Sequence, residues 1–139
     1  PIYEEELMAV LHEEHPLLQK CPQAISLAAL ANDHFYLAER AGSPLYNPWI
    51  LVLCQQAGFT PHLLEESGQP TTVLGYVAAG LGVTILPAQF AQLSTVGVRF
   101  LPLDPPLPHY RYCAAWVPQN SHAALAQFVK VAESIVADT

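Results

Sequence analysis

The sequence predicts an α/β domain. Short apolar runs that suit strands alternate with segments whose apolar residues recur at helical spacing, in the order strand-helix-strand-helix-strand. Of the 139 residues, 52% are hydrophobic and 12% are charged, so the chain can bury a sizeable core. Proline stands at the heads of both central helices and glycine at their ends, as is typical of helix boundaries. We therefore expect a sheet with helices on its faces.

The first forty residues predict two strands. An acidic lead-in, Glu4-Glu5-Glu6, precedes an apolar strand at residues 7–11, and His15-Pro16 then begins a turn. Ser26 can cap a short helix at residues 27–31. A second strand follows at residues 34–38.

A helix and a third strand come next. Ser43-Pro44 is a strong helix start, because serine caps well and proline fits the first helical position. The helix is predicted from about residue 45 to 57, and Gly58 ends it. A strand at residues 61–65 follows. The inner face of the helix is predicted to hold Trp49, Ile50 and Leu53.

The stretch from 71 to 87 reads as a helix, a glycine turn and a buried strand. The helix starts near Gln69-Pro70, and Gly80 and Gly82 turn the chain out of it. The apolar run at residues 83–86 suits a buried strand, which Pro87 ends. One helical face is predicted to hold Val73, Leu74, Val77 and Leu81.

The C-terminal part begins with a short helical turn at residues 87–93 and a strand at 98–101. The proline-rich stretch 103–108 favours a stiff, extended linker. A strand at 110–117 and a last helix follow, with Asn120 or Ser121 as the cap. The apolar stripe of that helix is Leu125, Phe128, Val129, Ala132 and Ile135.

Composition excludes some classes of function. The net charge is −7, with only five Lys and Arg residues, which argues against direct binding of nucleic acid. No apolar run approaches the ~20 residues of a membrane span. Cys21, Cys54 and Cys113 are widely spaced, as is typical of reduced thiols in a cytosolic protein. The chain has neither a signal peptide nor an initiator Met at Pro1, so we expect a fragment of a longer protein.

The N-termini of the two central helices, called helix heads below, each follow the end of a strand and are the best candidates for a binding site. Backbone N–H groups at such heads favour an anion, and in open α/β sheets ligands bind there. Nearby hydroxyls either help to hold a small carboxylate or only cap the helices, and the residues alone favour capping. Tyr46 is the better contact candidate and Trp49 the better core residue. Arg111, where the chain leaves the linker, is a plausible cleft cation.

Motifs for other chemistry are missing. His12-Glu13-Glu14-His15 lacks the four-residue histidine spacing of a zinc helix, so no metal is predicted. The sequence has no Gly-x-Ser-x-Gly elbow and no glycine-rich phosphate loop, so no cofactor is predicted either.

The run Gly75 to Pro87 resembles the effector domain of LysR-type transcriptional regulators, and residues 26–31 and 57–61 resemble its short helix and its helix-to-strand turn. The resemblance implies a type 2 periplasmic-binding-protein-like fold with two lobes. Residues 1–106 would form most of the second lobe, and residues 107–139 the crossover and the C-terminal part of the first.

The resemblance also implies a function: sensing a small organic anion in the cytoplasm, without catalysis or membrane contact. DNA binding would belong to a missing N-terminal domain of the parent, and a homo-oligomer is expected. The 109–139 strand and helix would fold onto the larger part or pair with another copy. The alternatives are a transport-type solute-binding protein with the same lobes and a small α/β enzyme.

By position, the resemblance assigns effector contacts to the loop before the first long helix and to the strand after the crossover, and it links Gln69 to switching. Thr71 joins these residues from the helix-head argument. The predicted effector-binding residues are Ser43, Pro44, Leu45, Tyr46, Gln69, Thr71 and Arg111.

Overall fold

The computed structural model describes residues 1–38, 45–64, 68–93 and 96–138, and it divides the chain into two compact units. The larger unit spans residues 6–108, and the smaller combines residues 1–5 with residues 109–139. Residues 1–5 therefore group with the C-terminal segment, whereas the expected division at 106 placed them in the larger part.

The larger unit is built on β2 (Leu7–His12), which pairs antiparallel with β5 (Thr84–Pro87) on one side and β6 (Val98–Pro102) on the other. Every residue of β5 is buried, as expected for a strand that is covered on both faces. Pro87 lies opposite Leu7 and is the last residue of β5, so the strand includes this proline and ends at it.

A second pair of strands extends this arrangement. β3 (His34–Phe35) and β4 (His62–Leu63) run parallel, and a bridge between Phe35 and Val83 joins β3 to the chain just before β5. Both strands are two residues long, shorter than the predicted strands at 34–38 and 61–65.

The helices of the larger unit follow most of the local signals. The first predicted turn is wrong: a five-residue helix forms there, because His15 Nδ1 accepts a 3.1 Å hydrogen bond from the Leu17 N–H and caps it. The short helix capped by Ser26 is confirmed as a 3₁₀ helix. The bounds are α1 (Pro16–Lys20), η1 (Leu27–Leu30), α2 (Tyr46–Gln56), α3 (Pro70–Ala78) and η2 (Ala88–Leu93).

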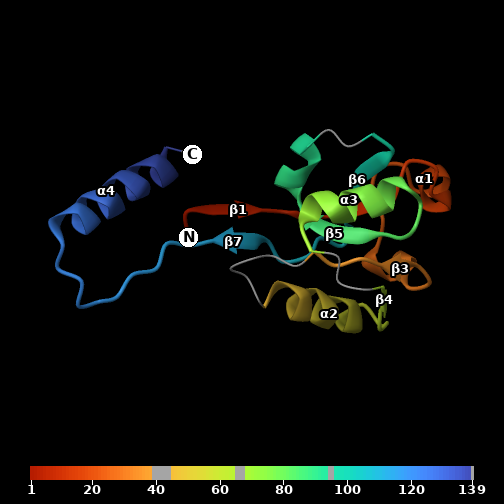
Figure 1. Ribbon diagram of the computed structural model, residues 1–139, viewed down its shortest axis with the longest axis horizontal. Helices are drawn as coiled ribbons and strands as arrows, with labels where there is room; N and C mark the ends of the chain where they lie inside the picture. Colours follow the sequence, from red (N-terminus) through yellow and green to blue (C-terminus); the bar gives the residue numbers. More distant parts are fainter. Residues whose placement is uncertain (39–44, 65–67, 94–95, 139) are drawn as a thin grey trace. The chain divides into compact units, whose positions relative to one another are not determined.

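The inner face of α3 forms the centre of the core. Its buried residues pack with Val10, Ala38 and Leu86, and α3 lies beside β5 in Figure 1. Leu81, predicted on the same face, is 51% exposed, because the helix ends at Ala78 and Gly80 turns the chain with φ +76°. The buried residues of α3 are Val73, Leu74 and Val77.

Gly82 has a packing role rather than the predicted turning role. Its φ lies outside the left-handed region, but a Cβ there would lie 2.6 Å from the His34 carbonyl oxygen. Glycine is therefore required for the close approach of two backbone segments.

The smaller unit consists of one strand pair and one helix. β1 (Tyr3–Glu5) pairs antiparallel with β7 (Tyr110–Tyr112), and α4 (Ala123–Ala137) follows. The strand predicted over 110–117 is thus much shorter. The predicted caps of α4 are wrong, because His122 is the N-cap and its Nδ1 accepts a 3.2 Å hydrogen bond from the Ala124 N–H.

Candidate functional site

The two central helices begin at one edge of the sheet. β3 leads towards α2 and β4 leads towards α3, and the two strands are parallel. Since parallel strands end at the same edge, the heads of both helices lie on the carboxyl side of this pair. Of the expected binding residues, Leu45, Tyr46, Gln69 and Thr71 belong to the N-terminal turns of these two helices.

The first turn of α3 presents Gln69 and Thr71 to solvent, and both side chains are exposed. The carbonyl of Gln69 accepts hydrogen bonds from the N–H groups of Thr72 and Val73, at 3.0 and 3.2 Å. Pro70 has no N–H, so Thr71 carries the first-turn amide that is not committed to this carbonyl. The Gln69 side chain makes no cap hydrogen bond.

The first turn of α2 differs from expectation. Ser43 and Pro44 lie outside the described residues, and Leu45 is 76% exposed. Tyr46 is only 2% exposed, and its hydroxyl donates a 2.9 Å hydrogen bond to the Ile85 carbonyl. The Tyr46 ring thus packs in the core instead of facing solvent, which differs from the exposed position expected of a ligand contact. Trp49, expected in the core, is only partly buried.

Arg111 lies in β7 of the smaller unit, directly opposite Glu4 in the ladder. Its Nε is 2.9 Å from Glu4 Oε1, and His109 Nδ1 is 3.8 Å from the other carboxylate oxygen. The Arg111 side chain is 66% exposed, so the rest of its guanidinium group still faces solvent.

Sequence reasoning missed a polar contact in this strand pair. The Tyr112 hydroxyl donates a 2.7 Å hydrogen bond to Oε1 of Glu5, whose side chain is buried. The two residues are 107 positions apart, so only the unforeseen pairing of β1 with β7 could have indicated the contact.

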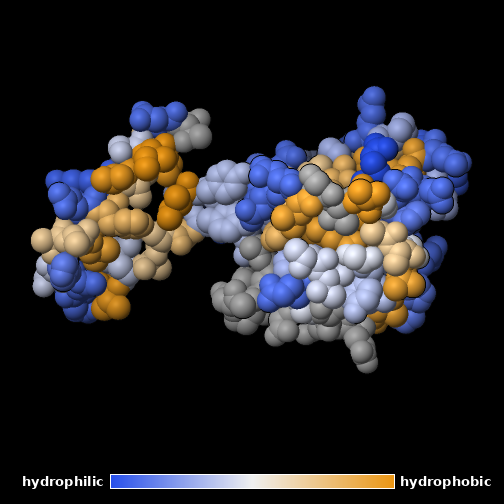
Figure 2. All heavy atoms as spheres, turned by 45° about the horizontal axis from the view of Figure 1, so that its top comes forward, coloured by the Kyte–Doolittle hydropathy of each residue, from blue (hydrophilic) through white to orange (hydrophobic). Residues whose placement is uncertain are grey.

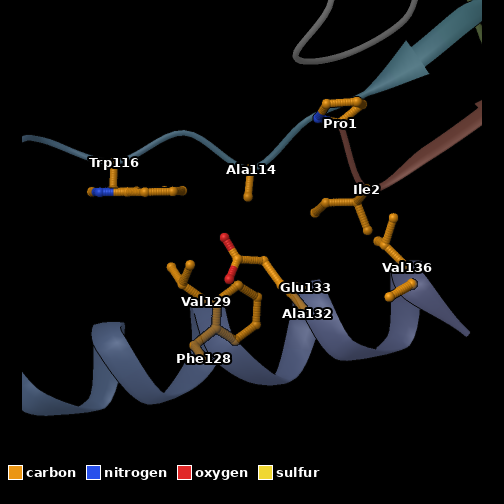
Figure 3. A pocket seen from close by; sticks show the side chains of 10 residues that line it. Pro1, Ile2, Ala114, Trp116, Phe128, Val129, Ala132, Glu133 and Val136 are labelled. Carbon is orange, nitrogen blue, oxygen red and sulfur yellow. The ribbon is translucent and has the colours of Figure 1, made fainter.

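Cavities open in each unit, and the three best-defined ones among the described residues are not lined by Leu45, Tyr46, Gln69, Thr71 or Arg111. In the larger unit, a cavity of about 390 Å³ lies between η1, the end of α2 and the prolines at 105–108, and one of about 220 Å³ lies near Leu103. In the smaller unit, a groove of about 300 Å³ lies between α4 and the extended segment after β7 (Figure 3). The groove is lined mainly by apolar side chains, and hydrophobic residues gather on this unit in Figure 2.

The titratable groups do not form an arrangement for nucleophilic or metal chemistry within the described residues. Burial raises the pKa of the Cys54 thiol to about 11, so it stays protonated near neutral pH. His12 and His15 each accept a backbone N–H at Nδ1. No group of three His, Cys, Asp or Glu side chains in the described part of the chain could hold a metal ion.

Comparison with known proteins identifies the family. The profile of the LysR substrate binding domain matches residues 1–135. The chain belongs to this family. The LysR assignment agrees with the α/β fold and with the glycine turn and buried strand after α3.

Relatives of this LysR domain are regulators. The chain is 32% identical over 109 residues to the HTH-type transcriptional regulator XapR of Escherichia coli (strain K12), covering 77% of this chain and 35% of that protein. It is 27% identical over 122 residues to AlsR of Bacillus subtilis (strain 168), covering 87% and 39%. The chain thus spans little more than a third of the length of these relatives. A transport protein is not favoured, because these relatives are transcriptional regulators.

Solved LysR structures share the fold. The effector binding domain of QuiR in complex with shikimate has a TM-score of 0.80 at 22% identity, covering 99% of this chain and 64% of that chain. The BenM effector binding domain with its effector benzoate has a TM-score of 0.75 at 22% identity, covering 98% and 61%. The type 2 periplasmic-binding-protein-like fold expected from the sequence is confirmed. In the parts of the chain described here, no helix is both long and apolar enough to cross a bilayer.

Proposed function

We propose that this chain is the effector-sensing part of a LysR-type DNA-binding transcriptional regulator and that it has no catalytic role. The observation that carries the proposal is the family match over residues 1–135, together with the two helix heads at one edge of the sheet. The relatives are regulators, and the two solved domains named above hold shikimate and benzoate. DNA binding would reside in a part of the parent protein outside this acidic chain, which acts in the cytoplasm.

The ligand class we propose is a small organic carboxylate. Shikimate and benzoate both carry this group, and the exposed N-terminus of α3 offers the hydroxyl and the backbone amide of Thr71 together with the positive end of a helix dipole. Gln69 and Thr71 remain proposed effector contacts in the larger unit, and Arg111 remains a proposed effector contact on the smaller unit, each taken by itself. Ser43, Pro44 and Leu45 remain proposed contacts of the preceding loop.

Tyr46 has a different proposed role. Its hydrogen bond to Ile85 fixes the first turn of α2 against β5, so Tyr46 would hold the N-terminus of α2 in place rather than touch the ligand. Residues 6–108, which form the larger unit, would be the second lobe of the effector domain. The paired strands β1 and β7 would then be the two crossovers that connect the lobes. Ligand binding would favour the closed arrangement of the lobes and shift the population of regulator conformations.

The test is titration of benzoate and shikimate into the intact regulator by calorimetry, with Thr71→Ala, Gln69→Ala and Arg111→Ala. Matched controls are the exposed Thr60→Ala, Gln55→Ala and Arg99→Ala. Each site variant should weaken binding by about tenfold, the effect of one charge-assisted hydrogen bond. If the site variants and the control variants bind with equal affinity, the assignment of these residues as effector contacts is wrong. If no member of a wider panel of small carboxylates binds, the proposal that the effector is a carboxylate is wrong.

Homo-oligomerisation is also proposed. The apolar side chains of α4 are largely exposed within the described residues, and an exposed face of this kind marks a surface that another polypeptide covers. A second copy of the regulator is the occupant we favour, and light scattering of the purified regulator tests it.

A further inference from the structure

Two histidines lie side by side in the larger unit. His34 and His62 are direct partners in the parallel ladder of β3 and β4, so their backbones are held on neighbouring strands about 4.8 Å apart. The centroids of their rings are 4.5 Å apart, and the ring planes are tilted by 49°. Both residues are exposed, so the rings can rotate without disturbing the core.

The ring nitrogens of this pair lack the partners that the other histidines have. The chain has six histidines, all within the described residues, and four of them use a ring nitrogen in a hydrogen bond or an ion pair. Among the described residues, no such partner faces a ring nitrogen of His34 or His62. The four engaged residues are His12, His15, His109 and His122.

We propose that His34 and His62 together bind one divalent transition-metal ion that prefers imidazole, such as Ni²⁺, Cu²⁺ or Zn²⁺. Imidazole nitrogens coordinate such ions at roughly 2.0–2.1 Å, which brings two donor nitrogens to about 3 Å of each other. A centroid separation of 4.5 Å satisfies this requirement after small side-chain rotations. Mg²⁺ and Ca²⁺ are not expected, because they prefer oxygen ligands.

The site has open coordination positions. Within the described residues no third His, Cys, Asp or Glu side chain joins the pair. Water, or a donor from another molecule, therefore completes the coordination. His34 and His62 lie within β3 and β4, whereas the proposed effector residues of the larger unit come after the ends of these strands. The metal site therefore does not depend on the proposed function.

Calorimetric titration of Ni²⁺ into the full 139-residue chain tests the proposal. Cys21 and Cys113 are exposed thiols, so both are replaced by serine in every sample. We expect one Ni²⁺ per chain and at least about a tenfold loss of affinity in His34→Gln and in His62→Gln, because each leaves a single donor. His109→Gln, the control on another exposed histidine, should leave the affinity unchanged.

Two results would overturn the site. One is an affinity of either single variant equal to that of the parent, and the other is an equal loss in His109→Gln. A second measurement needs no variant: paramagnetic Ni²⁺ should first broaden the amide NMR signals around residues 34 and 62. Broadening that begins elsewhere in the chain would contradict the proposal.

Discussion

The hydroxyl of Tyr46 donates a 2.9 Å hydrogen bond to the carbonyl oxygen of Ile85, and this bond ties the first turn of α2 to β5. The contact is buried and joins residues 39 positions apart. It therefore fixes one head of the candidate site to the most buried strand of the larger unit.

Removing this hydroxyl should destabilise the chain without changing its fold. Tyr46→Phe keeps the ring in the core but leaves the Ile85 carbonyl without this donor, so we expect a loss of about 1–2 kcal/mol in the free energy of unfolding. Urea denaturation measures the loss, and Tyr3→Phe, at a 53% exposed tyrosine, is the control. Equal stabilities of the two variants would contradict the prediction.

Local signals predicted the elements whose boundaries depend on adjacent residues. Proline after Gln69 marked the start of α3, and Gly80 with φ +76° marked its end, because both residues act through their own backbone angles. The apolar run before Pro87 predicted β5, because all four residues of that strand are buried.

Contacts between distant segments could not be predicted. Tyr46 and Trp49 are one turn apart and both aromatic, so helical spacing alone does not decide which of them faces the sheet. The answer depends on the position of Ile85, in another element. The short strand β7 likewise depends on β1, more than a hundred residues earlier in the chain.

Gly82 and Gly75 should respond in opposite ways to alanine. Gly82→Ala places a Cβ 2.6 Å from the His34 carbonyl oxygen, and the required backbone shift should cost about 1–3 kcal/mol. Gly75 lies within α3 with nothing within 4 Å of a new Cβ, so Gly75→Ala should stabilise the chain by about 0.5–1 kcal/mol. Thermal and urea unfolding measure both effects. A loss of stability in Gly75→Ala would show that this helix position is more crowded than the structure indicates.

The Cys54 thiol should make stability fall at alkaline pH. Its pKa is raised by burial from 9.0 to about 11, so the folded chain keeps a proton that the unfolded chain loses. The contribution is present below pH 9 and is lost as the pH rises to about 11, by up to about 3 kcal/mol. The free energy of unfolding, compared between Cys54→Ala and the parent at about pH 8 and about pH 10, measures the difference in slope.

Cys21→Ala is the control for this slope, because Cys21 is exposed. It should retain the pH dependence of the parent, whereas Cys54→Ala should show a shallower decline. Parallel declines in all three proteins would assign the alkaline destabilisation to other groups.

The apolar face of α4 should drive self-association of the 139-residue chain. Phe128, Val131 and Ile135 are 58%, 56% and 62% exposed, and they recur at helical spacing on a 15-residue helix. Phe128→Ser together with Ile135→Ser removes most of the exposed area and should weaken association by at least about tenfold. Light scattering over a concentration series measures the mass, with Gln127→Ser as the control on the same helix. A parent chain that stays monomeric throughout would show that this face does not join two copies, and equal association of the double variant would place the contact on another surface.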